Sequence, residues 1–171
     1  WGGTDGFCYG YNNKTQKDVD GYDLYQPIWK VDCNEPHYRK DKDGKKIPYA
    51  TPPGPSELIG TPVLYKEKVY CAIGQDPEHG DGVGRLSCLD AETGKALWKY
   101  TEVGRTISTV SVADDLVYIA EYAGIIHCID ANTGKVYWTH DSFSRIWGST
   151  LVVDGKLILG NEDGDLLVMD H

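Results

Sequence analysis

Short apolar runs separated by polar turn residues make up most of the chain. Runs of five to seven apolar or alternating residues, as at 60–65 and 68–74, end at Gly and Asp positions. This pattern is typical of β-strands joined by tight turns. Apolar residues at helical spacing are absent from the sequence, so the pattern predicts an all-β chain.

Two segments of the chain repeat almost letter for letter. Residues 88–98 (CLDAETGKALW) and 128–138 (CIDANTGKVYW) are offset by 40 residues, and the same offset relates 109–114 to 149–154. An earlier copy, which starts at Thr61, lies 48 residues before its successor and therefore carries 8 extra residues. A period near 40 built from short strands is typical of propeller blades.

Each copy divides into four strands, named A to D here, which in the clearest copy span 60–65, 68–74, 85–90 and 96–101. We predict an all-β β-propeller of four-stranded antiparallel blades, about three and a half of them in this chain and seven or eight in the complete ring. The predicted division is a partial blade (strands C and D) over 1–33, an elaborated inter-blade loop over 34–59, a blade over 60–102 with an insertion at 75–84, a blade over 103–142 and a partial blade (strands A to C) over 143–171.

A fainter copy opens the chain. Residues 7–12 are expected to form a C strand, and 12–17 stand where the DAETGK turn stands in the later copies. A polar insertion over 18–28 then precedes Trp29, which takes the position of Trp98.

The segment between strands C and D carries a recurring motif, Asp-x-x-Thr-Gly-Lys-x-x-Trp, in which Gly94 and Gly134 are expected to adopt positive φ. The motif resembles the tryptophan-docking motif of the quinoprotein (PQQ-binding-like) β-propellers. That family includes eight-bladed quinone-dependent alcohol dehydrogenases and cofactor-free relatives such as the outer-membrane assembly lipoprotein. The resemblance implies that three tryptophans, Trp29, Trp98 and Trp138, pack between blades.

The segments 74–80 and 146–150 are similar to a secreted, cofactor-free branch of the family found in planctomycete-type bacteria. Three and a half blades cannot close a ring, and open ends expose unpaired strand edges. The chain, which begins at Trp1 instead of Met, is therefore expected to be part of a longer chain. The alternatives are a ring completed by a second copy or by another polypeptide.

Charge and cysteine usage narrow the possible partners. The chain has 26 acidic against 17 basic residues and a net charge of −9, which disfavours nucleic acid. No apolar run is long enough to cross a bilayer and no signal-peptide pattern is present, so an extracytoplasmic (periplasmic or secreted) location follows from the resemblance alone. The five cysteines form no CxxC or CxxCH motif, which disfavours zinc-ribbon, thioredoxin-like and c-type haem sites.

In a four-stranded blade the D–A connections and B–C turns lie on one face, and the A–B and C–D turns on the other. The long segments 34–59, 75–84 and 140–147 are thus expected on a single face, which we expect to carry binding. Arg105 and Arg145 occupy equivalent D–A positions there. Two guanidinium groups can clamp a carboxylate or phosphate, with Trp147 as a stacking surface, or they can bond neighbouring loop carbonyls while Trp147 packs between blades.

The insertion at 75–84 holds candidate calcium ligands, Asp76, Glu78 and Asp81, because hard cations need several oxygen ligands on a turning backbone. A solvated acidic loop is the alternative. The resemblance implies that Glu78 would ligate Ca²⁺ and contact the quinone and that Asn161 is a second ligand. The adjacent cysteine pair that the dehydrogenases carry beside the quinone is missing.

Counting outward from the turn at Ala123 and Gly124 places residues 119 and 128 opposite each other, and their counterparts one blade earlier are Cys71 and Cys88. A cross-strand disulfide or two free buried thiols are both compatible with that register.

No Ser–His–Asp or Cys–His constellation is apparent, so no catalytic residue is predicted. We expect a non-catalytic binding or scaffolding propeller module that uses the D–A and B–C loops to dock a protein, a polysaccharide or a small ligand. The partner is a protein or the remaining blades of the same propeller, and no cofactor is expected. The alternatives are part of a PQQ- and calcium-dependent quinoprotein dehydrogenase, and an assembly subunit completed by partner chains.

Overall fold

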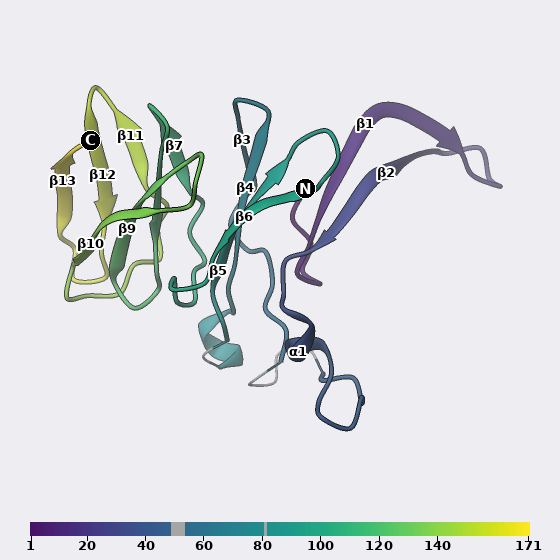
Figure 1. Ribbon diagram of the computed structural model, residues 1–171, viewed down its shortest axis with the longest axis horizontal. Coiled ribbons are helices and arrows are strands. Elements are labelled where there is room, and N and C mark those ends of the chain that lie inside the picture. Colours follow the sequence, from purple (N-terminus) through teal and green to yellow (C-terminus); the bar gives the residue numbers. More distant parts are fainter. Residues whose placement is uncertain (49–53, 81) are drawn as a thin grey trace.

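The computed structural model describes residues 1–48, 54–80 and 82–171, which form four antiparallel sheets side by side in chain order (Figure 1). Each sheet joins strands that follow one another in sequence, as the blades of a propeller do. The predicted all-β propeller of antiparallel blades is thereby confirmed. The first sheet holds β1 (Phe7–Lys17) and β2 (Asp23–Asp32); the second β3 (Val63–Tyr65), β4 (Lys68–Ile73), β5 (Arg85–Asp90) and β6 (Ala96–Tyr100); the third β7 (Ser111–Ala113), β8 (Leu116–Ala120), β9 (Ile125–Asp130) and β10 (Val136–Asp141); and the fourth β11 (Leu151–Val153), β12 (Lys156–Gly160) and β13 (Leu166–Asp170).

Two short helical turns complete the structure, α1 (Pro36–Arg39) after the first sheet and η1 (Pro77–His79) in the insertion between β4 and β5. Within the described residues no helix is long and apolar enough to cross a membrane.

Each sheet shares a hydrophobic core with the next. Val117 and Ile119 of β8 face the second sheet, whereas Tyr118 and Ala120 of the same strand face the fourth. Successive side chains of a strand point to opposite sides, so one strand supplies apolar groups to two cores. The sheets are therefore held together pairwise, through three successive interfaces.

The turns between the first two strands of the last three sheets share one backbone conformation. Each has two successive residues with positive φ, as type I′ hairpins require. They are spaced by the same 48 and 40 residues as the sequence repeat, at Lys66 and Glu67, Asp114 and Asp115, and Asp154 and Gly155.

The C–D turn of the second sheet is closed by its own side chains. Asp90 Oδ1 accepts hydrogen bonds from the amide of Thr93 (2.8 Å) and from its hydroxyl (2.6 Å). Gly94 follows with φ of 72°. A Cβ at Gly94 would lie 2.7 Å from Cδ2 of Trp29, so the indole of the first sheet lies directly on this glycine.

The same contact recurs one blade later. Trp98 lies on Gly134, whose φ is 75° and whose Cβ would meet the ring at 2.8 Å. The indole N–H of Trp98 donates to the carbonyl of Ala131 at 3.0 Å, as Trp29 does to Ala91. The C–D turns of the second and third sheets are thus the surfaces on which the tryptophans of the preceding sheets lie.

The two C–D turns differ at one position. In the third sheet Tyr137 donates from its hydroxyl to Asp130 Oδ2 at 2.7 Å, whereas Leu97 stands at that position in the second sheet. The bond from Tyr137, together with those from Thr133, lowers the pKa of Asp130 to about 2. The bonds from Thr93 lower the pKa of Asp90 without a tyrosine.

The structure corrects the expected turn at 12–17, which instead continues β1 to Lys17. The turn lies at 18–22, where Asp18 Oδ1 accepts the amides of Asp20 and Tyr22. Gln16 stands where the later copies have Gly94 and Gly134. Glycine adopts positive φ more readily than glutamine, and β1 continues past this position with an irregular pairing between Tyr11 and Thr15.

The predicted facing of Cys71 and Cys88 is wrong by one residue, because β4 pairs Cys71 with Ser87 and Tyr70 with Cys88. The next blade shows the cause: Glu121 and Ile125 are bonded across a three-residue turn, which gives a different register from the assumed two-residue turn. A shift of one residue turns side chains to opposite faces. Cys71 therefore lies in the core with the first sheet and Cys88 in the core with the third.

We predict that Trp98→Ala lowers the free energy of unfolding by about 2–4 kcal/mol, because it removes both the ring on Gly134 and the bond to Ala131. Trp98→Phe, which loses the bond but keeps an aromatic ring, should cost about half as much. Chemical denaturation measures both values. A loss below about 0.5 kcal/mol for the alanine variant would contradict the inter-blade role of this tryptophan.

The contacts of Asp130 predict an acid-sensitive turn. A carboxyl whose folded pKa lies below the unfolded value of about 3.9 stabilises the fold above that pH, and the contribution disappears as the pH falls through about 2. In Tyr137→Phe the pKa of Asp130 should rise, and Asp90 should titrate as before. Carboxyl-detected NMR titration checks both groups, and an unchanged Asp130 would refute the assignment to Tyr137.

Candidate binding site on the loop face

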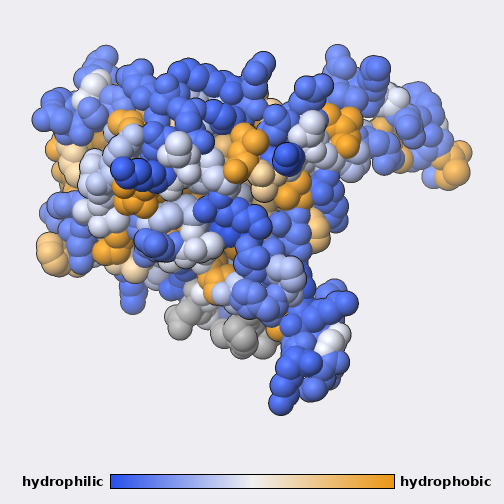
Figure 2. Space-filling model, in the orientation of Figure 1, coloured by the Kyte–Doolittle hydropathy of each residue, from blue (hydrophilic) through white to orange (hydrophobic). Residues whose placement is uncertain are grey.

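Connections between sheets and turns between the second and third strands of each sheet meet at one end of the structure, which we call the loop face (segments 33–48, 54–62, 74–80, 82–84, 101–110, 121–124, 142–150 and 161–165). Figure 1 shows α1 and η1 together at this end. Figure 2 shows mainly hydrophilic side chains over the segment around α1.

Tyr122, in the turn between β8 and β9, is the centre of an aromatic and cationic cluster. Its ring is buried, with the guanidinium carbon of Arg105 at 4.4 Å and that of Arg145 at 5.4 Å from the ring centroid. The indole of Trp147 meets it edge to face, with ring centroids 5.0 Å apart. Arginine over an aromatic face is a favourable cation–π arrangement, worth about 0.5–2 kcal/mol.

Backbone hydrogen bonds fix the position of this cluster. The amide of Tyr122 donates to the carbonyl of Arg105 at 2.8 Å, and the carbonyl of Tyr122 accepts from Ile146 at 3.2 Å. The turn is therefore attached to the connections on both of its sides. This explains why arginines 40 residues apart converge on one ring.

The two arginines have different environments. Arg105 donates from Nη1 to the carbonyl of Gly80 and so ties the 75–84 insertion to the third blade. The side chain of Arg145 is 60% exposed and lies 3.8 Å from Glu162. Arg105 thus bonds a neighbouring loop carbonyl, which was one of the two roles expected for it. Arg145 and the half-exposed Trp147 instead present a charge and an aromatic surface to solvent.

A buried hydrogen-bond chain supports the cluster from below. Tyr100 Oη lies 3.0 Å from Nδ1 of His127, and Nε2 of His127 lies 2.8 Å from Glu121 Oε1. Glu121 Oε1 also accepts the amide of Gly104 at 2.7 Å. Burial, with Glu102 and Glu121 nearby, raises the pKa of Tyr100 to about 12, so the phenol keeps its proton.

Both ring nitrogens of His127 therefore have a partner, Tyr100 at Nδ1 and Glu121 at Nε2. Each member of the chain is bonded inside the protein. The chain holds the two residues that flank the cluster, Gly104 and Glu121.

The structure describes two of the three predicted calcium ligands, Asp76 and Glu78. Asp76 caps η1, where its Oδ1 accepts the amide of Glu78 at 2.8 Å, and Asp81 lies outside the described residues. No group of three or more His, Cys, Asp or Glu side chains that could hold a metal ion is found in the part of the chain that the structure describes.

Asn161 is engaged in its own turn. Its Oδ1 accepts the amide of Asp165 at 2.9 Å, and its Nδ2 lies 3.3 Å from Asp165 Oδ2. It belongs to the fourth sheet and Glu78 to the second, with the third sheet between them. The shared calcium and quinone site stays a prediction, and we derive no chemistry from it.

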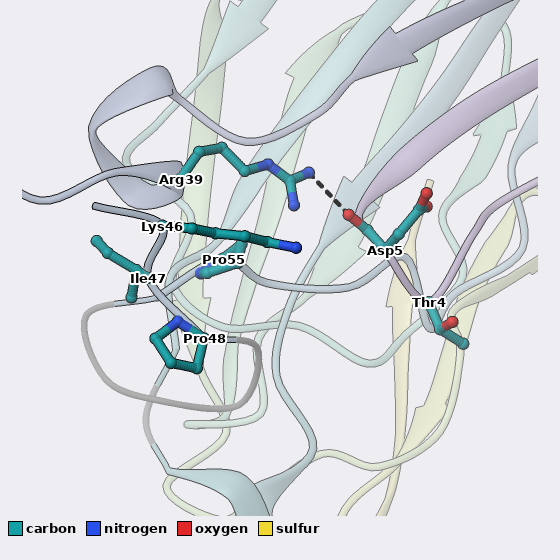
Figure 3. A pocket seen from close by; sticks show the side chains of 7 residues that line it. All are labelled: Thr4, Asp5, Arg39, Lys46, Ile47, Pro48 and Pro55. Carbon is teal, nitrogen blue, oxygen red and sulfur yellow. Dashed lines mark hydrogen bonds between the residues drawn. The ribbon is translucent and has the colours of Figure 1, made fainter. Parts of the chain in front are cut away.

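A cavity of about 530 Å³ opens at the first blade, between the turn before β1 and the connection after α1 (Figure 3). Arg39 spans it and donates to the carbonyl of Asp5 at 2.7 Å, while its other side-chain hydrogen bonds form a two-pronged pair with Asp32. The lining residues are Thr4, Asp5, Arg39, Lys46, Ile47, Pro48 and Pro55. None of the predicted site residues lies in this cavity.

Sequence reasoning did not identify Tyr122. Its position was available, because the turn between β8 and β9 lies next to both arginine-bearing connections in a propeller. The chain has 12 tyrosines, so residue type alone did not distinguish Tyr122, the tyrosine in the turn between β8 and β9.

Comparison with known proteins identifies the family of this chain. The family model described as "Outer membrane protein assembly factor BamB" matches residues 82–171. No curated protein matches the chain.

Similar solved structures include two enzymes. Quinohemoprotein alcohol dehydrogenase ADHIIG from Pseudomonas putida HK5 is 24% identical, with a TM-score of 0.54 over 65% of this chain and 18% of its own. Quinohemoprotein alcohol dehydrogenase from Comamonas testosteroni is 23% identical, with a TM-score of 0.54 over 66% of this chain and 19% of its own.

BamB from Moraxella catarrhalis is 13% identical, with a TM-score of 0.50 over 99% of this chain and 54% of its own. The chain thus spans about a fifth of the two enzymes and about half of BamB. At these identities the solved structures share the fold alone. The family model covers more than half of the chain, and the chain therefore belongs to the BamB-type family of PQQ-like β-propeller repeat proteins.

Proposed function

We propose that this chain is a non-catalytic binding module of an extracytoplasmic propeller, and that it binds a protein partner through the D–A and B–C loops of the loop face. The cluster around Tyr122 carries the proposal. It combines a fixed aromatic ring with two guanidinium groups, and it leaves Arg145 and Trp147 accessible.

The chemistry of the cluster favours a partner that presents a carboxylate beside an apolar or aromatic group. Guanidinium groups recognise carboxylates through paired hydrogen bonds, and Trp and Arg are enriched where protein partners bind most strongly. The chain has a net charge of −9, so two guanidinium groups beside one ring are a local concentration of positive charge on an acidic protein, with Glu162 at 3.8 Å from Arg145. Long-range repulsion would then select partners whose acidic groups are few and well placed.

The family supports both the partner class and the location. Its model is described as an outer membrane protein assembly factor, which names a protein that works with other proteins outside the cytoplasm. The fourth sheet also exposes apolar side chains, Leu151, Val153, Leu166 and Val168. These exposed apolar side chains favour a further blade as the neighbour of this sheet. That blade would come from a longer chain or from a partner chain that completes an assembly subunit.

A second candidate function is part of a PQQ- and calcium-dependent dehydrogenase. It is supported by the fold shared with the two quinohemoprotein alcohol dehydrogenases. In that case Glu78 and Asn161 would contact the cofactor, with Asp76 and Asp81 near the metal. The internal bonds of Asp76 and Asn161 weigh against it.

We predict that the chain binds an acidic, tyrosine-containing peptide more tightly than the same peptide with Asn and Gln in place of Asp and Glu. Arg145→Ala should weaken binding about 5- to 10-fold, because a charge-assisted hydrogen bond is lost. Added salt should weaken binding further. Calorimetric titration measures each affinity.

Lys135→Ala is the matched control, because it removes one exposed charge from a C–D turn on the opposite face. Equal affinity of Arg145→Ala and the unchanged chain, or of the two peptides, would refute the proposed site.

The dehydrogenase candidate predicts a different result. Titration of the chain with PQQ in the presence of Ca²⁺ should give no saturable change in quinone absorbance if the binding module is correct. Saturable binding that Glu78→Gln abolishes would instead support the dehydrogenase, and the peptide experiment would remain a separate test of the loop face.

A further inference from the structure

Three buried thiols meet where the first sheet packs against the second. Cys8 belongs to β1, Cys33 directly follows β2 and Cys71 belongs to β4, and all three lie in one hydrophobic core with exposures of 0%, 0% and 2%. The sulfur atoms of Cys33 and Cys71 are 3.6 Å apart. Residues from two blades, 38 positions apart in sequence, thus approach at their reactive atoms.

Cys71 is the central member of the three. Contact with its thiol lowers the pKa of Cys8, whereas contacts with Cys33 and Cys8, together with burial, raise the pKa of Cys71. These shifts agree with the geometry, in which both thiols of the first sheet face one thiol of the second. The remaining cysteines, Cys88 and Cys128, lie in the other two cores.

We propose that Cys71 forms a disulfide bond with Cys33 that links the first blade to the second, and that Cys8 is placed to exchange with this bond. The sulfurs must approach by roughly 1.5 Å to reach the usual S–S bond of about 2.05 Å. The inference is independent of the proposed function of the loop face.

The reaction balances with a disulfide-bearing oxidant, such as oxidised glutathione. The two thiols give up two protons and two electrons as the S–S bond forms, and the oxidant is reduced to two thiols. In the exchange step, the Cys8 thiolate attacks the sulfur of Cys71, a Cys8–Cys71 bond forms and Cys33 leaves as a thiolate. Either bond joins the same two blades, so exchange preserves the link.

The link would fasten the base of the longest connection on the loop face. Next to Cys33, the side chain of Asn34 bonds both the carbonyl and the amide of Ser56 at 2.8 Å. A bond from Cys33 to Cys71 therefore anchors both ends of the 34–59 connection to the second blade. Because the thiols are buried, the oxidant reaches them only when the first sheet is undocked, during folding or local opening.

The test is to fold the full chain with oxidised glutathione and to alkylate it in denaturant with and without prior reduction. The reduced chain has five free cysteines to alkylate, and we expect the oxidised chain to take two fewer groups. Peptide mapping should find Cys33 joined to Cys71. The melting temperature of the oxidised chain should be roughly 5–15 °C above that of the reduced chain.

Single variants separate the members of the trio. Cys8→Ser should keep the Cys33–Cys71 bond, Cys33→Ser should move it to Cys8–Cys71, and Cys71→Ser should remove it and make the melting temperature independent of reductant. Cys88→Ala is the matched control from another core and should keep the bond. If a serine variant does not fold, the peptide map of the unchanged chain decides alone.

Three results would overturn the proposal. The first is a folded, oxidised chain in which five cysteines still alkylate. The second is a disulfide mapped to Cys88 or Cys128. The third is a native mass with one zinc ion per chain that accounts for the protected thiols, because that result would make the trio a metal site.

Discussion

The contact between the tryptophan of one blade and the glycine of the next blade's C–D turn is the interaction on which this structure depends. The Asp and Thr side chains shape the turn, the positive φ of Gly94 and Gly134 closes it, and the missing Cβ leaves room for an indole. Each full copy of the motif has a tryptophan that packs toward the following blade and a glycine that receives the tryptophan of the preceding blade. Local turn chemistry thereby sets the packing between blades.

The repeat made the fold predictable, because positions 40 or 48 residues apart share one role. It identified the strands of the three later sheets and the two regular C–D turns. It failed where one residue decided the outcome: Gln16 in place of glycine extended β1, and an odd number of residues in a turn reversed the faces of Cys71 and Cys88. Sequence spacing identifies equivalent positions, but it does not fix the pairing of strands across a turn of unknown length.

The loop face was predictable in part for the same reason. Arg105, Arg145 and Trp147 emerged from the repeat and from their position beside a D–A connection, and the structure brings them to one ring. Their difference arises from the insertion over 75–84, because Gly80 of that insertion accepts a hydrogen bond from Arg105, whereas Arg145 lies beside Glu162. Equivalent positions in a repeat protein share a backbone, and the irregular loops give them separate roles.

The pairwise arrangement of the cores has a consequence for the dynamics of the chain. Since each sheet packs only against its immediate neighbours among the described residues, opening one interface leaves the others intact. Amide exchange is then graded along the chain. It is slowest in β4, β5, β8 and β9, which lie between two cores, and fastest in the β1–β2 hairpin beyond Trp29, whose tip carries a fully exposed Val19. Such a chain behaves as a row of coupled units instead of one cooperative body.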